Sequence, residues 1–238
     1  MSAWVRSFLA LALFLAAGAA AQEPVPDPAE RALEALIREH EASELGRVES
    51  YQTFRPRFEE FAKAHRGTEA EAGASLWLIQ QTWWLRQDGT MEETSLPLAE
   101  DLLERHLESP QLGLLVEYSY VFSKKERKTL YERLAAGSPH PEVKAAAHFG
   151  LAKLSPARQE DGAPNPHFAA ILEEYADLPW RSTTFGRIAD AYLNPLTQED
   201  LAVGRQVPEI EGLDQNGQLM RLLDFRGKVV MLDFWGDW

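Results

Sequence analysis

Residues 123–151 read SKKERKTLYERLAAGSPHPEVKAAAHFGL, and this stretch predicts two helices joined by a tight turn. Ser123 and Glu126 form a capping box, in which the serine hydroxyl accepts from the backbone at the third helical position and the glutamate reaches back. Gly137 ends the first helix, and Pro141 suits the first turn of the second, where a missing N–H leaves no bond unmade. A helical hairpin is therefore expected.

The same helical period extends over most of the chain, from about residue 28 to residue 193. Leu33, Leu36 and Ile37 recur at the spacing of one helix face, and His40 follows one turn further on. Residues 69–87 are apolar over more than half of the circumference, which indicates a helix buried between neighbours. Loosely similar segments begin near residues 58, 98, 131 and 168, as in stacked helix pairs of the tetratricopeptide type. An irregular helical bundle fits the same pattern, so both architectures remain open.

Composition and charge narrow the possible classes of function. The chain has 238 residues, of which 45% are hydrophobic, and this is typical of a protein with a packed core rather than a disordered one. Its formal net charge of −13 disfavours binding to nucleic acids and to anionic lipid surfaces, where Lys and Arg must neutralise phosphates. The acidic surface is expected to keep the protein soluble.

The N-terminus has the pattern of a secretory signal peptide. Arg6 precedes an apolar run over residues 8–15, and Ala16-Ala-Gly-Ala-Ala-Ala21 supplies the small residues of a cleavage site, with cleavage expected after Ala21. An uncleaved membrane anchor is the alternative, but residues 8–21 are shorter than the about 20 residues that cross a bilayer. The sequence contains no cysteine that could carry a lipid anchor. We therefore expect an exported protein, periplasmic or extracellular, that has lost residues 1–21.

The helical region shows no catalytic or metal-binding pattern. No two of the six histidines have the i, i+4 spacing that places two ligands on one helix face, so they are interpreted as ordinary helix-end or surface residues and no metal site is expected. Trp77, Trp83 and Trp84 are interpreted as core residues. No phosphate loop or other cofactor motif is present in the sequence, and no cofactor is expected.

After about residue 197 the pattern changes from helix to strand. Residues 207–222 predict two strands around Asn216-Gly217, the preferred pair for a tight hairpin turn because both central residues take positive φ. Val229-Val-Met-Leu-Asp-Phe-Trp235 is then apolar on both faces, as a central parallel strand is. Asp233 is out of place in this run, because a buried carboxylate is unfavourable unless it is paired, neutralised or functional.

Three segments of this region carry a resemblance to a known family: Val203-Gly-Arg-Gln-Val-Pro-Glu-Ile210, Leu222-Leu-Asp-Phe-Arg-Gly-Lys228 and Phe234-Trp-Gly-Asp-Trp238. Together they resemble the opening of extracytoplasmic thioredoxin-like proteins of the TlpA and ResA type, and redoxins of the thiol-specific antioxidant class open similarly. The resemblance implies that a mostly α chain ends in the β-hairpin and first core strand of an incomplete thioredoxin-like α/β domain.

The resemblance also implies roles for single residues. Asp233 matches the buried aspartate that accepts a proton from the second active-site cysteine, and a carboxylate in an apolar strand has a raised pKa that suits proton exchange near neutral pH. An aspartate at the edge of a frayed strand is the alternative. Trp235 and Trp238 match aromatic residues beside the dithiol, and Phe234 matches a core position. In the family a Cys-x-x-Cys motif follows the tryptophan that matches Trp238, whereas this sequence contains no cysteine.

These patterns predict three parts: a signal peptide over residues 1–21, a helical domain over 22–200 and the N-terminal fragment of a thioredoxin-like domain over 201–238. The complete form would carry out thiol–disulfide exchange on client proteins. Without the dithiol this chain should be inactive by itself, and residues 205–238 should be poorly packed or dock only partly on the helical region. Because the family is one of oxidoreductases but this chain has no cysteine, its own status as an enzyme stays open. A non-enzymatic helical interaction protein with a degenerate redoxin tail is the alternative, and peroxide reduction by the complete form is a third possibility.

Overall fold

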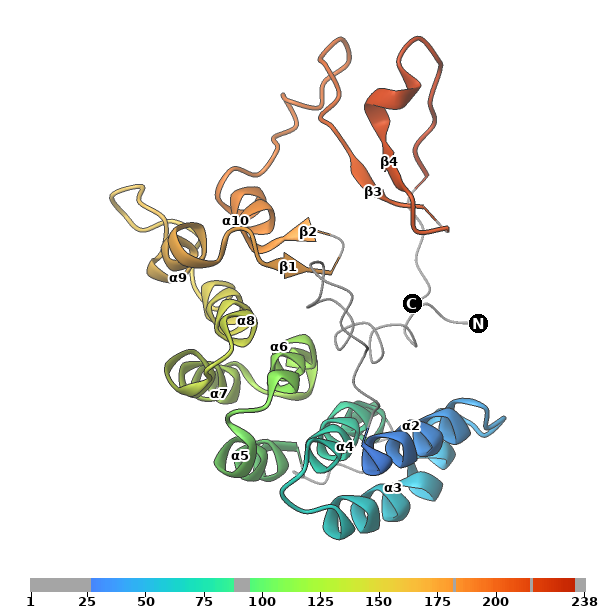
Figure 1. The fold of residues 1–238 in the computed structure, drawn as a ribbon. Coiled ribbons are helices and arrows are strands. Elements are labelled where there is room, and N and C mark those ends of the chain that lie inside the picture. Colours follow the sequence, from blue (N-terminus) through green and yellow to red (C-terminus); the bar gives the residue numbers. More distant parts are fainter. Residues whose placement is uncertain (1–26, 88–94, 182, 215, 234–238) are drawn as a thin grey trace, which may run out of the picture. The chain divides into compact units, whose positions relative to one another are not determined.

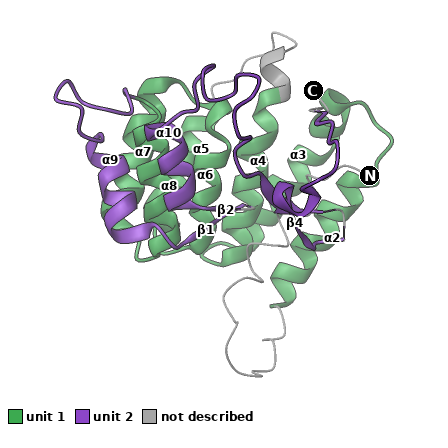
Figure 2. Ribbon diagram, turned by 90° about the horizontal axis from the view of Figure 1, so that it is seen from above, with its two compact units in different colours: residues 1–154 green, residues 155–238 purple. Residues whose placement is uncertain are grey.

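The computed structural model describes residues 27–87, 95–181, 183–214 and 216–233, with the backbone alone described over residues 84–87. The predicted signal peptide, the side chain of Trp84 and the motif residues Phe234, Trp235 and Trp238 lie outside this part. The chain divides into two compact units, residues 1–154 and residues 155–238, which are described separately (Figure 2). This division falls earlier in the chain than the predicted domain boundary between residues 200 and 201.

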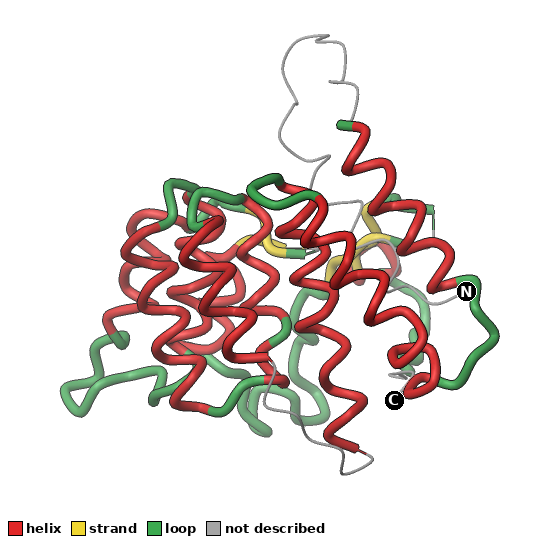
Figure 3. The backbone as a smooth tube through the Cα atoms, turned by 90° about the horizontal axis from the view of Figure 1, so that it is seen from below, coloured by secondary structure: helices red, strands yellow, loops and turns green. Residues whose placement is uncertain are grey.

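Over the described residues the protein is mostly helical, with two small antiparallel strand pairs (Figures 1 and 3), and this confirms the helical character predicted from the sequence. In its described residues the first unit contains helices and turns only. These helices are α2 (Pro28–Glu41), α3 (Arg47–Ala64), α4 (Glu69–Gln87), α5 (Ser95–His106), η2 (Pro110–Gly113), α6 (Leu114–Glu117), η3 (Ser119–Val121), α7 (Lys124–Gly137) and α8 (Pro141–Ala152). No helix in the described residues combines the length and the apolar character needed to cross a bilayer.

Several helices of the first unit begin where the sequence predicts. The Ser123 hydroxyl accepts from the N–H of Glu126, and the Glu126 carboxylate accepts from the N–H of Ser123 at 2.6 Å, which completes the predicted capping box of α7. Asp27 and Glu30 cap α2 in the same way. Pro141 is the first residue of α8, as expected. The first N–H groups of a helix have no partner within the helix. A capping side chain accepts from them and proline has none, so these residues determine where each helix begins.

Helix α4 is the centre of the first unit and packs against α2, α3 and α5 (Figure 1). All of its residues from 70 to 79 are buried, which confirms the predicted helix between neighbours. The Trp77 ring stacks on the Phe58 ring of α3 with 3.6 Å between their centroids. Leu33 and Leu36 of α2 belong to the same cluster. Large aromatic surfaces are thus removed from water at the point where three helices meet.

Helices α7 and α8 form the predicted hairpin and approach closely at Gly150. A Cβ atom at this position would lie 2.6 Å from two ring carbons of Tyr131 and 3.1 Å from a methyl carbon of Val116, so glycine permits the close packing. Helices α3 and α4 form another pair joined by a short connection. Such pairs occur both in helical repeats and in bundles, and the choice between these two architectures stays open.

The second unit combines short helices with both strand pairs. Its elements are α9 (Pro166–Ala170), the π-helical turn η4 (Ile171–Tyr175), β1 (Pro179–Trp180), β2 (Thr183–Thr184), α10 (Phe185–Leu193), β3 (Glu211–Leu213), β4 (Leu219–Arg221) and η5 (Leu222–Phe225). Phe168, Ile171 and Phe185 are buried and supply the apolar core of its helical part. Strands β1 and β2 pair directly before α10.

The predicted hairpin around Asn216-Gly217 is present as the β3–β4 pair, with Leu213 opposite Leu219. Its turn differs from the expected tight type. Gly217 has a φ of 77°, and the loop between the last paired residues, Leu213 and Leu219, is longer than a two-residue turn. Instead, one carboxylate oxygen of Asp214 accepts from the N–H groups of Asn216 and Gln218, both at 2.8 Å. This carboxylate organises a longer loop, so the conformation with two positive φ angles is not required.

The expected central strand over residues 229–235 is not formed in its described part, residues 229–233. Val229 and Met231 are 102% and 91% exposed, so the prediction of a core strand is wrong for this part of the chain. A central strand needs a neighbour on each edge and cover on both faces. Strands β3 and β4 pair only with each other among the described residues. No described residue between 205 and 233 is buried, which confirms the poor packing expected here.

Candidate functional site

The residues with a predicted redox role do not form a site in the described part of the chain. Asp233 is exposed, whereas its apolar neighbours predict a buried carboxylate. The difference arises because the strand that would bury Asp233 is not formed. Phe234, Trp235 and Trp238 lie outside the described residues, so their position beside a dithiol stays a prediction.

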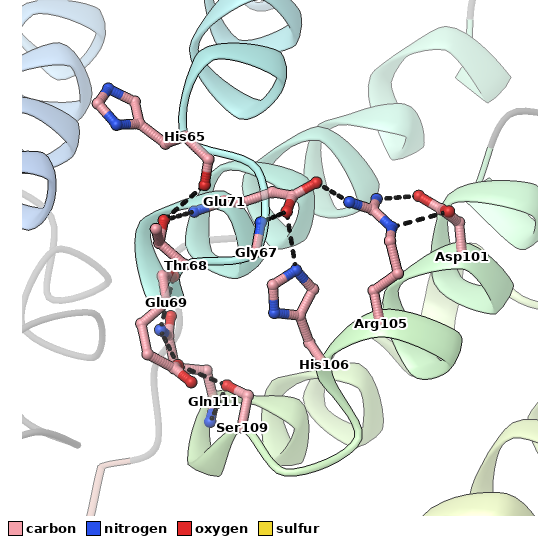
Figure 4. A network of polar contacts seen from close by, with 10 residues as sticks. All are labelled: His65, Gly67, Thr68, Glu69, Glu71, Asp101, Arg105, His106, Ser109 and Gln111. Atoms are coloured by element: carbon pink, nitrogen blue, oxygen red, sulfur yellow. Dashed lines mark hydrogen bonds and ion pairs between the residues drawn. The ribbon is translucent and has the colours of Figure 1, made fainter.

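A polar network built around Glu71 lies where α4 begins and α5 ends (Figure 4). Glu71 stands in the first turn of α4 and is only 3% exposed. Its Oε2 accepts from the N–H of Gly67 and lies 3.0 Å from Nε2 of His106, which is also buried. Because an ionised carboxylate can only accept, this contact requires a proton on His106 Nε2.

Arg105 completes the pairing of Glu71. Its Nη1 donates to Oε1 of Glu71, and its Nε donates to Oδ1 of Asp101 at 2.9 Å. Asp101 and Arg105 form an i, i+4 pair on α5. The guanidinium therefore bridges one buried and one exposed carboxylate, an arrangement that suits its fixed, planar set of donors.

Two opposing effects act on the pKa of Glu71. Burial raises it, because the charged form loses its contact with water, but hydrogen bonds from Gly67, Arg105 and His106 favour the charged form. Together these bonds hold the pKa of Glu71 below its ordinary value. The pKa of Arg105 is raised, first by its hydrogen bond to Asp101 and then by Glu71. Both members of the ion pair are therefore charged at neutral pH.

A second arm of the network fastens the start of α4 to η2. Ser109 Oγ donates to Oε2 of Glu69 at 2.6 Å, and Nε2 of Gln111 donates to the same oxygen at 2.8 Å. Thr68 Oγ1 accepts from the N–H of Glu71 and so caps the helix. The network joins segments up to 42 residues apart in the sequence and links α4, α5 and η2 into one assembly.

The chemistry available to this network is limited. Both carboxylate oxygens of Glu71 are occupied by donors, and its lowered pKa makes it a poor general acid near neutral pH. Ser109 donates to the carboxylate of Glu69 rather than to an imidazole, so it lacks the histidine base of a catalytic triad. The arrangement clamps helices together and displays no bond-making chemistry.

No protein-family model, no curated protein and no solved structure matches this sequence. The function is therefore inferred from the residues of the chain itself. The thioredoxin-like character expected of residues 203–238 stays a prediction, and the Glu71 network is the polar cluster described in the helical part.

Sequence reasoning missed this network, although one signal was present. Glu71 stands among Ala70, Ala72 and Ala74 in a helix predicted to be buried, and a carboxylate in such a position needs a partner. His106, interpreted as an ordinary helix-end residue, is the last residue of α5 but is buried and bonded. The partners of Glu71 lie 34 and 35 residues away in the sequence, so no local spacing indicates them.

Two other histidines make structural contacts, His40 with aromatic rings and His140 with a backbone carbonyl group. His40 lies edge-on to the rings of Phe54 and Trp77, with centroids 5.2 and 5.0 Å apart, and burial lowers its pKa. His140 Nε2 lies 2.8 Å from the carbonyl oxygen of Glu108. Within the part of the chain that the structure describes, no three His, Asp or Glu side chains are grouped as metal ligands would be.

Proposed function

We propose that this chain belongs to an exported thioredoxin-like thiol–disulfide oxidoreductase in which a helical domain precedes the redox domain. The observation that carries the proposal is the succession of Gly227-Lys228, the apolar residues 229–232, Asp233 and Phe234-Trp-Gly-Asp-Trp238. The complete protein would act in the periplasm or outside the cell, on client proteins with thiols or disulfides, through a mixed disulfide. Because this sequence contains no cysteine, the chain has no such activity by itself.

The local structure before residue 229 supports this proposal. The hairpin β3–β4 is followed directly by η5, and Gly227 takes a φ of 81° just before the apolar residues. The order of hairpin, short turn and apolar segment is the one that the resemblance implies. In a complete parallel sheet, neighbouring strands would pair with the edges of this segment, and helices on the two faces of the sheet would cover the exposed side chains of residues 229–232.

In the complete domain, Asp233 would accept a proton from the second cysteine. Burial in a formed strand would raise the pKa of this carboxyl group and suit it to proton exchange near neutral pH. We therefore expect Asp233→Asn in the complete protein to slow thiol–disulfide exchange at neutral pH without changing the melting temperature of the helical domain.

The decisive experiment uses the native protein from the cells that export it. Antibodies against residues 27–152 would capture it from the extracytoplasmic fraction. Intact mass, alkylation of thiols after reduction and an insulin-reduction assay would follow. A mass above that of residues 22–238, two alkylated thiols and catalysed insulin reduction are expected. The recombinant chain of residues 22–238 is the matched control and should be inactive.

A non-enzymatic helical interaction protein is the second candidate. The absence of cysteine from all 238 residues favours it, as does the clamped, well-packed helical unit. A native protein with the mass of residues 22–238 and no thiol would contradict the redox proposal and support this alternative. Peroxide consumption without insulin reduction, measured on the same sample, would instead indicate a peroxide-reducing redoxin.

A further inference from the structure

We infer that Glu211 acts as a latch that holds the hairpin β3–β4 against helix α10. Nη1 of Arg187, on α10, donates to Oε1 of Glu211, on β3. Nε of Arg221, on β4, lies 3.3 Å from Oε2 of the same carboxylate. One carboxylate therefore receives two guanidinium groups, one from the helix and one from within the hairpin. This inference concerns the chain as it folds and does not depend on the redox proposal.

The strand register explains how the carboxylate is positioned. Glu211 lies directly opposite Arg221, and opposite residues of an antiparallel pair present their side chains on the same face. Arg221 thus holds one oxygen, while the other remains available to Arg187. Only 22% of the Glu211 side chain is exposed, against 58% for Arg187 and 52% for Arg221. Water therefore screens the shared carboxylate less than it screens either cation.

Apolar burial does not hold the hairpin in place. Leu213, Leu219 and Met220 are 60%, 56% and 50% exposed. Among the described residues, no backbone hydrogen bond joins the hairpin to α9 or α10. Single exposed ion pairs contribute little, but a carboxylate shared by two arginines forms a small network with charge-assisted bonds. The position of the hairpin on α10 should therefore depend on Glu211 and should respond to salt.

The absence of cysteine allows labels to be placed at chosen positions in the full chain. Ala191→Cys on α10 and Leu219→Cys on β4 introduce exposed sites for two spin labels, whose separation pulsed EPR would measure. We expect a single narrow maximum at low salt and its loss at about 1 M NaCl, where the screening length falls to a few ångströms. Glu211→Gln should lose the single maximum already at low salt. Glu173→Gln removes an exposed carboxylate from the same unit and should leave the distribution unchanged.

A second variant separates the latch from the folding of the hairpin itself. Arg187→Gln removes the partner on the helix and leaves the Glu211–Arg221 pair within the hairpin. We expect unchanged amide protection in β3 and β4 together with a broadened label distance. Distributions as narrow as that of the unaltered chain in both variants would overturn the inference. It would also be overturned if Glu211→Gln broadened the distribution and Arg187→Gln did not, because Glu211 would then act within the hairpin alone.

Discussion

Glu71 links its own helix to two residues of α5, Arg105 and His106, through one buried carboxylate. Taking such a carboxylate out of water is unfavourable, and the hydrogen bonds that it accepts offset this penalty. Removing one partner leaves the others buried without compensation, so the effect of a substitution exceeds that of a single hydrogen bond in water. The network is therefore sensitive to changes at Glu71.

Replacing Glu71 by glutamine is expected to reduce the free energy of unfolding by about 1–3 kcal/mol at neutral pH, because Arg105 and His106 lose a charged acceptor. The pKa of Glu71 is lower in the folded than in the unfolded chain. Its carboxylate therefore adds stability above the unfolded pKa, and this contribution is lost as the pH falls through the folded pKa. Urea denaturation at pH 7 and at acidic pH should show a smaller acid-induced loss in Glu71→Gln than in the unaltered protein.

The control for this experiment is Glu100→Gln, which alters an exposed carboxylate on α5 and should change stability by no more than about 0.5 kcal/mol. If Glu71→Gln lost as much stability in acid as the unaltered protein, the charge of Glu71 would not contribute as described.

Trp77 anchors the core of the first unit at the residue scale. Trp77→Ala removes a ring that stacks on Phe58 and leaves a cavity between α2, α3 and α4, so we expect a loss of about 3–5 kcal/mol in unfolding free energy. Leu45→Ala, at a position that is 40% exposed, should cost less than about 0.5 kcal/mol. Chemical denaturation of both variants would test this; similar losses would show that Trp77 is not a core anchor.

At the scale of the element, sequence reasoning succeeds where the signal is local. The capping box of Ser123 and the helix start at Pro141 depend on residues within one turn, and both are present in the structure. The hairpin turn was predicted in the correct place but with the wrong geometry. There the Asp214 side chain accepts from two backbone N–H groups of a longer loop, and the Asn216-Gly217 pair alone does not reveal these bonds.

The α7–α8 hairpin provides a test at this scale. Gly150→Ala would place a methyl group 2.6 Å from the Tyr131 ring, so we expect a loss of unfolding free energy of about 1–3 kcal/mol as the two helices move apart. Gly113→Ala is the matched control. The nearest atom to a Cβ there is 4.0 Å away, and the backbone is helical, so stability should be unchanged or slightly increased. Thermal melting of both variants distinguishes these outcomes, and equal melting temperatures would refute the close packing at Gly150.

For the whole molecule, the predictable part of the fold is the part with periodic helices. The pattern of residues 69–87 is sufficient to predict α4 as a core helix, because a helix buried on all sides has apolar residues around most of its circumference. Residues 229–233 have the composition of a core strand but do not form one here. A parallel strand forms only when distant segments supply its neighbouring strands, and the sequence of the strand alone does not show whether they are present. The Glu71 network was missed for the same reason, since its partners are also distant.

The contrast between the helical unit and the C-terminal segment should be measurable by hydrogen exchange. Amides of α4, which is surrounded by other helices, are expected to exchange slowly, whereas amides of residues 229–233 should exchange at rates close to those of an unfolded peptide. Mass spectrometry of peptides from both regions in one experiment provides the internal control. Strong protection of residues 229–233 would contradict the exposed arrangement described here.

The local and the long-range hydrogen bonds of Glu71 are expected to form at different stages of folding. Its bond to Thr68 closes within one turn of helix, whereas its bond to Arg105 spans 34 residues and forms only when α5 docks. Long-range contacts of this kind are expected late on the folding route, so Arg105→Gln should accelerate unfolding more than it slows folding, as stopped-flow measurements would show. Equal changes in the folding and unfolding rates of Arg105→Gln would indicate that α5 docks before or at the transition state of folding rather than after it. Late formation would make this clamp a determinant of how long a folded molecule survives in the presence of proteases.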